Sequence, residues 1–361
     1  KDKIFSIDYI LVFSILTLGI ISMFAMYSTD GGSFAYHTKS HILRFFVFFS
    51  LFLLISFFPI KFWFQSSLAI YFIFFLLLLG VKYFGLTSSG SQRWINLYVI
   101  NLQPSELMKI GLILFLAKYY HRIPVSDVNR FKFLFFPLIC VSAPALLVMS
   151  QPDLGTAILI VAGGIIVAFL AGIKFKFFAY ISIIFLALAP IAISFLKPYQ
   201  KERILTFINP DRDPLGAGYQ IIQSKIAIGS GGLFGKGFLN GSQSYLDFLP
   251  EKHTDFIFTL FSEEFGFFGS VFILLLYSLI LSRIVKIGHQ TRSNFGKLYC
   301  YGFAGAFFVY VVVNMGMVLG LLPIVGAPLP IMSYGGSSML AIMLGLGIVM
   351  SCKIYKDTPV N

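Results

Sequence analysis

The sequence predicts an all-α polytopic membrane protein with ten transmembrane helices. Only 12% of its 361 residues are charged and 58% are hydrophobic, whereas a soluble domain carries about 25% charged residues. Apolar stretches of about 18 to 20 residues recur along the chain, and each is long enough to cross a hydrocarbon core about 30 Å thick. These runs are continuous rather than alternating, which excludes an outer-membrane barrel. The same composition excludes a soluble enzyme, a disordered chain and a disulfide scaffold.

The predicted spans follow one another with one long interruption. The first apolar run is too long for the core of a signal peptide and has no small-residue cleavage site after it, so we expect a retained span. Residues 1–361 are expected to form a single integral membrane domain, with residues 197–255 as a large extracytoplasmic loop between spans seven and eight. Within that loop, segment 220–228 has the apolar spacing of an amphipathic interfacial helix. The ten spans cover residues 8–27, 41–58, 66–84, 104–120, 133–150, 154–172, 177–196, 256–282, 298–319 and 334–352.

The basic residues indicate the orientation of these spans. With both termini placed in the cytoplasm, the inner segments hold 15 of the 27 Lys and Arg residues. The outer segments, apart from the long loop, hold five, namely Lys39, Arg44, Lys82, Arg93 and Lys109. This bias predicts that the N- and C-termini are both cytoplasmic. The net charge of +12 is therefore explained by topology and by anionic membrane lipid, and it does not indicate binding to nucleic acid.

The acidic residues have the opposite distribution, since most lie in outer loops, at outer ends of spans or within the eighth span. We therefore expect any chemistry at the outer face. Ionisable residues at such places are functional candidates by default, because hydrocarbon makes an unpaired charge costly. The candidates selected on this basis are Arg44, Arg93, Glu106, Lys109, Asp153 and Asp255.

Each of these six candidates also has a structural interpretation. Glu106 and Lys109 follow Pro104 at the start of the fourth span, and their i,i+3 spacing predicts an ion pair on one helix face. Arg44 near the start of span two is able to extend its head group to the interface. Arg93 is equally compatible with an ordinary loop arginine beside an interfacial tryptophan.

The two aspartates begin spans. Asp153 precedes Thr156 by three residues and reads as the N-cap of the sixth span, and Asp255 has the same alternative at the eighth. Glu263 and Glu264 lie two turns further on, where packing does not explain adjacent carboxylates. The residues alone thus predict an outer-leaflet cavity in which cations suit a diphosphate and a carboxylate suits proton abstraction. A lipid-linked diphosphate sugar fits such a cavity, and so does the substrate of an ion-coupled transporter.

Ordered motifs over nearly the whole chain resemble one bacterial family. The sequence is similar to the SEDS (shape, elongation, division, sporulation) proteins, which are peptidoglycan glycosyltransferases with ten spans. Within the family, the loop at 235–244 is closer to the elongation members than to the division members. The matching segments are Arg93–Leu97, Gln103–Lys109, Gln151–Ala157, Asp213–Gln220, Gln223–Leu233, Leu249–Phe258 and Pro328–Ser337.

The resemblance implies an activity and assigns roles to residues. It implies polymerisation of lipid II at the outer face of the bacterial cytoplasmic membrane, with Asp255 as the catalytic aspartate. By analogy, Arg44, Arg93 and Lys109 line the diphosphate of the donor. The further candidates for substrate binding are Glu106, Asp153, Lys236 and His253, and a divalent cation, Mg²⁺ or Mn²⁺, is an expected ligand of Glu106 and Asp153.

The mechanism expected from this resemblance is a single inverting displacement. Asp255 removes the proton of the acceptor's 4-hydroxyl, the oxygen attacks the anomeric carbon of the donor, and undecaprenyl diphosphate leaves, assisted by cations. Two alternatives stay open at this point. A flippase for the lipid-linked precursor needs the cations without the base, and a structural scaffold needs neither.

The resemblance also implies a partner, a class B penicillin-binding protein that docks on spans eight and nine and the large outer loop. Span nine contains the small-xxx-small pair Gly302 and Ala306. In lipid, small residues permit close approach of helix backbones. We therefore predict that this face of span nine receives the partner's single transmembrane helix, with packing inside the bundle as the alternative.

Overall fold

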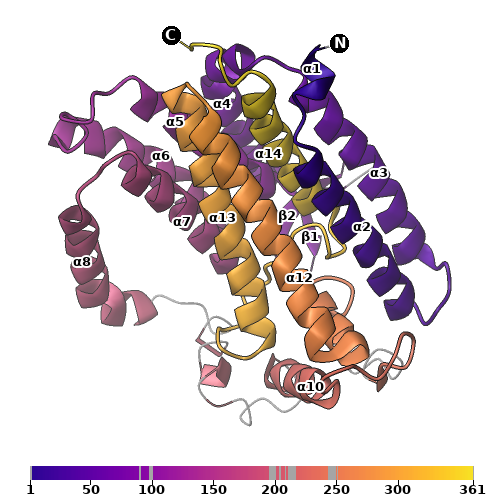
Figure 1. Cartoon of the computed structure of the whole chain (residues 1–361). Coiled ribbons are helices and arrows are strands. Elements are labelled where there is room, and N and C mark those ends of the chain that lie inside the picture. The colour runs from indigo at the N-terminus through magenta and orange to yellow at the C-terminus, as the bar shows by residue number, and fades with distance from the viewer. Residues whose placement is uncertain are drawn as a thin grey trace.

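Each of the ten predicted apolar segments forms a helix (Figure 1). The computed structural model describes residues 2–88, 91–96, 101–194, 201–202, 205–207, 209, 217–242, 249 and 251–360. The ten helices are α2 (Tyr9–Thr29), α3 (Tyr36–Ser56), α4 (Ile60–Phe84), α5 (Pro104–His121), α6 (Phe131–Ser150), α7 (Leu154–Leu170), α8 (Phe175–Ser194), α12 (Ile257–Gln290), α13 (Asn294–Val318) and α14 (Gly336–Ile354). A short helix, α1 (Asp2–Phe5), precedes them.

The helices differ in how well they meet the requirements for crossing a membrane. Within the described residues, seven are long and apolar enough, namely α2, α3, α4, α6, α12, α13 and α14. Helix α7 is shorter, with 17 residues, and α5 contains three charged side chains, Glu106, Lys109 and Lys118. An all-α membrane fold is thus confirmed, while length and composition alone support seven spans.

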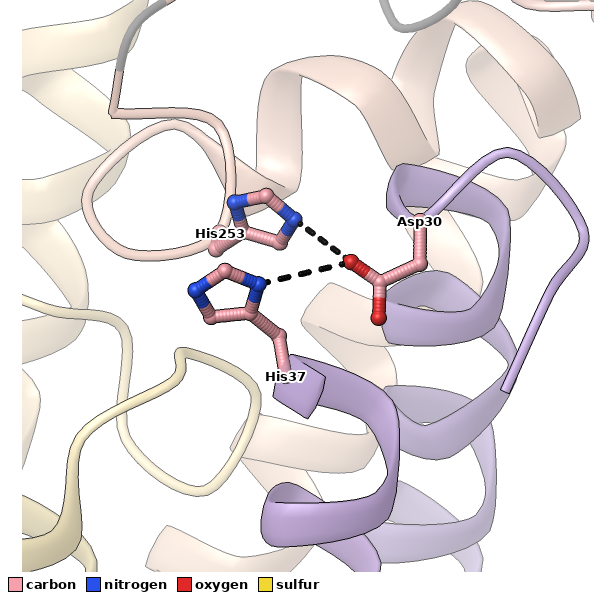
Figure 2. A group of neighbouring side chains, drawn as sticks. All are labelled: Asp30, His37 and His253. Atoms are coloured by element: carbon pink, nitrogen blue, oxygen red, sulfur yellow. Dashed lines mark hydrogen bonds and ion pairs between the residues drawn. The ribbon is translucent and has the colours of Figure 1, made fainter. Parts of the chain in front are cut away.

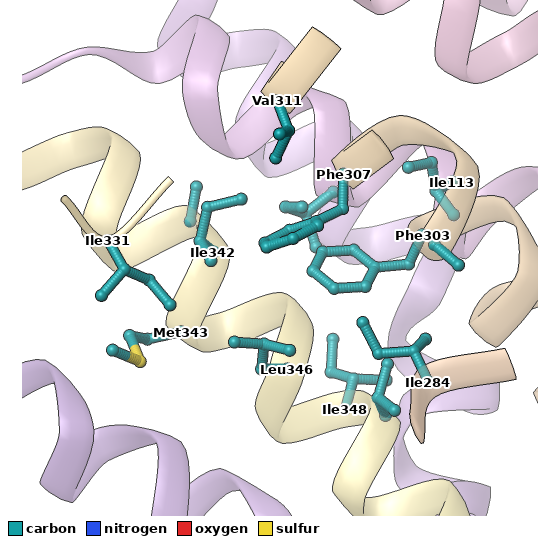
Figure 3. Packing of buried hydrophobic residues seen from close by; sticks show 14 of the residues in the cluster. Ile113, Ile284, Phe303, Phe307, Val311, Ile331, Ile342, Met343, Leu346 and Ile348 are labelled. Atoms are coloured by element: carbon teal, nitrogen blue, oxygen red, sulfur yellow. The ribbon is translucent and has the colours of Figure 1, made fainter. Parts of the chain in front are cut away.

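Helices α5, α13 and α14 form the centre of the bundle. Figure 3 shows Phe303 and Phe307 of α13 facing Ile342 and Leu346 of α14, with Ile113 of α5 close by. All five side chains are buried. Around this centre, α3 packs on α14, α4 packs on α5, and α7 packs on both α5 and α13. Polar residues on α5 and α13 are therefore shielded from lipid by other helices.

Both ends of the chain lie at the same end of the bundle (Figure 1). The Lys3 ammonium donates a hydrogen bond of 2.8 Å to the Tyr355 hydroxyl. Nearby, the Arg283 guanidinium binds both carboxylate oxygens of Asp8, with Nη2 at 2.5 Å from Oδ2. These contacts agree with an even number of passes through the bundle.

A small antiparallel sheet, which the sequence analysis did not anticipate, connects α4 to α5. Its strands β1 (Leu86–Ser88), β2 (Ser91–Asn96) and β3 (Asn101–Leu102) pair in that order. In Figure 1 strands β1 and β2 lie near the middle of the view, beside α12 and α14. Its position matters because β2 carries Arg93 and β3 leads directly into α5.

The long loop contains the helix that its apolar spacing predicts. Helix α10 (Ala217–Ser230) includes the predicted segment 220–228. The Ser224 hydroxyl is 2.8 Å from the Thr259 hydroxyl of α12 and donates to the Val318 carbonyl of α13 at 2.7 Å. Helix α10 therefore covers the ends of α12 and α13. The motif at Asp213 lies outside the described residues except for its end.

Helix α12 is broken at Gly266, whose φ of 65° is not helical. The carbonyls of Glu263 and Glu264 accept the backbone N–H groups of Lys236 and Gly237, each at 3.0 Å. A Cβ on Gly266 would lie 2.3 Å from a backbone nitrogen of this facing turn. Glycine is therefore required both for the conformation and for the close approach.

The prediction that Gly302 receives a partner helix is wrong. A Cβ at Gly302 would lie 2.5 Å from Val167 Cγ2 of α7 and 3.2 Å from Ile113 Cγ2 of α5. The glycine is buried and serves packing inside the bundle.

The Gly302→Leu variant should consequently lose about 1–3 kcal/mol of stability, because it overpacks this contact. Thermal melting of the detergent-purified chain measures the loss. The matched control is Gly80→Leu on α4, where an added Cβ meets no atom within 4 Å. Equal melting temperatures of the two variants would contradict the internal packing of Gly302.

Candidate active site

The segment before α12 holds the backbone of Asp255 in a fixed position. Three consecutive carbonyl oxygens, those of residues 253–255, each accept a hydrogen bond from a distant part of the chain. The donors are the Tyr334 N–H at 2.8 Å, the Ser333 hydroxyl at 2.6 Å and the Asn314 amide at 2.9 Å, in that order. Such over-determined backbone positions are expected where a side chain must be pre-organised.

The Asp255 side chain is half-buried beside the loop that joins α13 to α14. Its Oδ2 lies 3.6 Å from the place that a Cβ would occupy on Gly326, which has a φ of 70°. Helix α12 begins at Ile257, and its N-cap is Phe256, which forms no side-chain cap bond. The alternative that Asp255 caps this helix is therefore wrong.

A buried charged cluster joins α5 to α13. The Lys109 ammonium lies 2.7 Å from Glu106 Oε1, which confirms the predicted ion pair. The Tyr310 hydroxyl of α13 lies 2.8 Å from both oxygens of Glu106, and the Lys109 ammonium contacts the same hydroxyl. All three side chains are buried. Since a buried charge is costly without its partner, each member of this cluster depends on the others.

Asp153 and Arg93 meet at the start of α7. Asp153 accepts the Thr156 N–H at 3.1 Å and its hydroxyl at 2.9 Å, which confirms the predicted N-cap. Arg93 Nη1 lies 3.6 Å from Asp153 Oδ2. The same guanidinium donates to the carbonyls of Gln151 and Pro152. Arg93 is thus bound to the turn before α7.

Tyr310 links these groups into one polar region. Its hydroxyl contacts Glu106 and Lys109, and Asn314, one turn further along α13, donates to the Asp255 carbonyl at 2.9 Å. The Gln103 amide, which precedes α5, donates to Asp153 at 3.4 Å. Helices α5 and α7 both begin here, and helix N-termini contribute partial positive charge. The region can accordingly bind an anion beside a carboxylate.

Arg44 and His253 approach this region through Tyr334. The Arg44 guanidinium lies 4.8 Å from the centroid of the Tyr334 ring. The backbone N–H of the same tyrosine binds the His253 carbonyl. Arg44 is half-buried against this loop. The alternative that its head group extends freely to the membrane–water interface therefore does not fit its position.

Lys236 has a different setting. Its ammonium lies 2.5 Å from Glu263 Oε1 and 2.9 Å from the Ser242 hydroxyl. The neighbouring Glu264 accepts a hydrogen bond from Ser28 of α2. These bonds give both adjacent carboxylates a structural role at the break in α12. In the part of the chain that the structure describes, the contacts of Lys236 do not connect it to the Tyr310 cluster.

Two side chains of the site were missed by the sequence analysis. Tyr310 and Asn314 lie one helical turn apart on α13, and both face the polar region. Asn314 also donates to the Ala327 carbonyl at 2.7 Å, so it ties the Asp255 segment to the loop after α13. A buried asparagine within an apolar span was the available signal.

The comparisons with known proteins identify the family. The family model described as "Cell cycle protein", for FtsW, RodA and SpoVE, matches residues 3–358. The chain belongs to this family. The resemblance to SEDS proteins is thereby confirmed.

Named relatives place the chain among the elongation-type members. The peptidoglycan glycosyltransferase MrdB of Escherichia coli K12 is 46% identical over 290 residues, which are 80% of this chain and 77% of its own. Stage V sporulation protein E of Bacillus subtilis is 38% identical over 292 residues, 80% of this chain and 79% of its own. The probable peptidoglycan glycosyltransferase FtsW of Coxiella burnetii is 37% identical over 298 residues, 81% and 79% of the two chains.

Solved structures that resemble this chain support the same family assignment. A chain from a peptidoglycan synthase complex, solved to explain the structural coordination of polymerisation and crosslinking, has a TM-score of 0.83 and 32% identity, and the match covers 97% of this chain and 98% of that one. The rod shape determining protein RodA of Thermus thermophilus has a TM-score of 0.74 and 28% identity, with 98% of each chain covered. Together with the match to MrdB, this likeness to RodA confirms the predicted similarity to the elongation members.

Proposed function

We propose that this chain polymerises lipid II into β-1,4 glycan strands at the outer face of the bacterial cytoplasmic membrane, for cell elongation and shape. The assignment as a peptidoglycan glycosyltransferase rests on its family and on 46% identity to MrdB. The observation that carries the mechanism is the pinned backbone of residues 253–255, which fixes the segment that carries the Asp255 carboxylate.

In this mechanism Asp255 acts as the general base. It accepts the proton of the acceptor's 4-hydroxyl while that oxygen attacks the anomeric carbon of the donor, and the bond from that carbon to the undecaprenyl diphosphate breaks. An α-linked donor then gives a β-1,4 bond by inversion, without a covalent intermediate. General-base assistance is worth about 10²–10⁴-fold in rate.

The leaving diphosphate is assigned to the cations Lys109 and Arg93. Lys109 and Arg93 already bind carboxylates, and charge-assisted hydrogen bonds to phosphate oxygens would extend the same network. Arg44, whose guanidinium lies 4.8 Å from the centroid of the Tyr334 ring, is proposed to bind the diphosphate as well. Lys236, which pairs with Glu263, is supported only as a residue that holds the turn against α12. The His253 carbonyl helps to hold the Asp255 segment by accepting the Tyr334 N–H. We also propose that the His253 side chain contacts the substrate.

A divalent cation, Mg²⁺ or Mn²⁺, is proposed at Glu106 and Asp153. Mg²⁺ is usually held by one or two carboxylates together with substrate phosphates, and these two residues offer that donor set. The bound ion would neutralise charge on the departing diphosphate. Restoration of polymerisation by Mg²⁺ in metal-stripped protein would support this assignment, and full activity without added metal would contradict it.

We further propose ten spans with both termini in the cytoplasm. The joint position of α1 and the end of α14 supports an even number of spans. Helices α5 and α7 would then cross the membrane within the shelter of the other helices, and α8, whose described apolar side chains are largely exposed, would cross in contact with lipid (Figure 1). The polar region, α10 and the small sheet would face outward. Accessibility of single cysteines to an impermeant thiol reagent in intact cells tests this topology.

The partner is proposed to be a class B penicillin-binding protein, whose transmembrane helix lies on the lipid-facing sides of α12 and α13 and whose contacts extend to the large outer loop. One structural neighbour belongs to a peptidoglycan synthase complex in which polymerisation and crosslinking are coordinated. An apolar stripe on α12 remains exposed, formed by Phe268, Phe272, Leu275 and Leu279. Phe308 and Val312 of α13 are exposed as well.

Disulfide crosslinking tests this surface. We expect Leu275→Cys and Phe308→Cys to crosslink to single cysteines in the partner's transmembrane helix. The three native cysteines are buried, so background should be low. Leu43→Cys on α3, which is equally exposed to lipid, is the matched control. Crosslinking at position 43 in place of positions 275 and 308 would contradict the proposed surface.

A flippase is the second candidate function, because the same cations would bind the diphosphate of lipid II during translocation. Vesicles containing the purified chain and fluorescent lipid II distinguish the two. The proposal predicts that glycan chains form and that the lipid does not equilibrate between leaflets. Rapid equilibration without chain formation would favour the flippase.

A further inference from the structure

Three side chains from distant parts of the sequence meet at the outer end of α2 and α3, and Figure 2 shows their arrangement. Asp30 ends α2, His37 begins α3, and His253 lies in the segment that leads to Asp255. His253 Nε2 lies 3.0 Å from Asp30 Oδ1, and His37 Nδ1 lies 3.5 Å from the same oxygen. Each histidine thus points one ring nitrogen at a single carboxylate oxygen.

The geometry of this group points to a metal ion. The three ligand atoms all lie within 4.8 Å of one another, and among the described residues this is the one group of three such side chains so placed. The two imidazole rings are stacked, with centroids 4.1 Å apart. Zn²⁺ binds histidine nitrogen at about 2.0–2.1 Å and carboxylate oxygen at about 2.0–2.2 Å. Small side-chain rotations would therefore bring all three atoms onto one ion.

The carboxylate is already oriented for this role. The other oxygen of Asp30, Oδ2, accepts the Thr38 hydroxyl at 2.6 Å and the Thr38 N–H at 2.9 Å. Oδ1 is left facing the two histidines. Hydrogen-bonded ligating carboxylates of this kind are typical of metal sites, where the outer bonds fix the ligand.

We propose that Asp30, His37 and His253 form a binding site for one zinc-type divalent ion, with an open fourth position. Two nitrogen ligands and one oxygen ligand favour Zn²⁺ over Mg²⁺ and Ca²⁺, which prefer oxygen ligands. The ion would connect the α2–α3 turn to the segment that carries Asp255. The site is defined by its own three ligands, so a Zn²⁺ titration tests it without any measurement of glycosyl transfer.

Zinc titration of the full-length chain tests the site. The chain is purified in detergent without a polyhistidine tag and stripped of metal with a chelator, and Zn²⁺ binding is followed by calorimetry. We expect one Zn²⁺ per chain and an increase in the melting temperature on saturation. Mg²⁺ in excess should not displace this Zn²⁺, because two of its three ligands are nitrogen.

Three variants make the test specific. His37→Gln should weaken Zn²⁺ binding by at least about 100-fold, since a direct ligand should count for more than the 10–100-fold of an outer partner. Thr38→Val keeps the shape of a buried side chain and should weaken binding about 10-fold. His289→Gln, at an exposed histidine of α12, should bind as the wild type does.

His37 is partly exposed, with 42% of its side chain accessible, so its replacement should not impair folding. An unchanged melting temperature of the metal-free His37→Gln variant checks this point. Wild-type affinity of His37→Gln for Zn²⁺, or no binding by the wild type, would overturn the proposal and leave a hydrogen-bonded cluster only.

Discussion

The Asp255→Asn variant is expected to keep its fold and to lose polymerisation of lipid II by about 10²–10⁴-fold. Asparagine has the same shape but cannot accept the proton of the attacking hydroxyl. The backbone bonds to residues 253–255 come from Tyr334, Ser333 and Asn314 and do not involve the carboxylate. The initial rate of glycan formation measures the loss, and the melting temperature reports the fold.

A matched control lies in the same segment. Glu251→Gln removes a carboxylate that is exposed and accepts only a local bond from Thr254 among the contacts described. Its activity should stay near that of the wild type. If Asp255→Asn polymerised lipid II at the wild-type rate, Asp255 would not be the base. A large fall in its melting temperature would instead assign the residue a structural role.

The Lys109→Met variant should have a kcat/KM for lipid II that is about 10- to 100-fold lower. A hydrogen bond to a charged group contributes about 1.5–3 kcal/mol, and methionine retains the packing volume while removing the donor. The variant also leaves Glu106 buried without its cation. Steady-state kinetics at varied lipid II concentration give the ratio.

A double variant separates substrate binding from charge neutralisation. If Lys109 binds the diphosphate, Glu106→Gln/Lys109→Met should remain as impaired as Lys109→Met. Recovery of activity in the double variant would mean that Lys109 serves only to neutralise Glu106. Lys118→Met at the other end of α5, where the ammonium binds the Gln65 carbonyl, is the control and should stay active.

The helices were predictable because their signals are local. The apolar length of each span is set by the surrounding lipid, so composition alone reveals it. The N-cap at Asp153 and the pair of Glu106 and Lys109 depend on spacings of three residues, and both are present. Helix α10 follows equally from its own apolar periodicity.

The features that were missed depend on contacts between distant residues. Tyr310 is more than 200 residues from Glu106, and no local pattern reports their hydrogen bond. The break at Gly266 arises because a separate turn is packed against α12. The small residue at position 302 shows close helix packing, but its neighbour is α7 rather than a partner.

Formation of glycan chains from labelled lipid II tests the central claim most directly. The purified chain is incubated with lipid II, with and without a class B penicillin-binding protein, and the products are separated by size and digested with a muramidase. The account predicts chains that the muramidase cleaves at β-1,4 bonds, and it predicts that Asp255→Asn forms them about 10²–10⁴-fold more slowly. Absence of chains from the wild type, in the presence of a partner that binds it, would contradict the account.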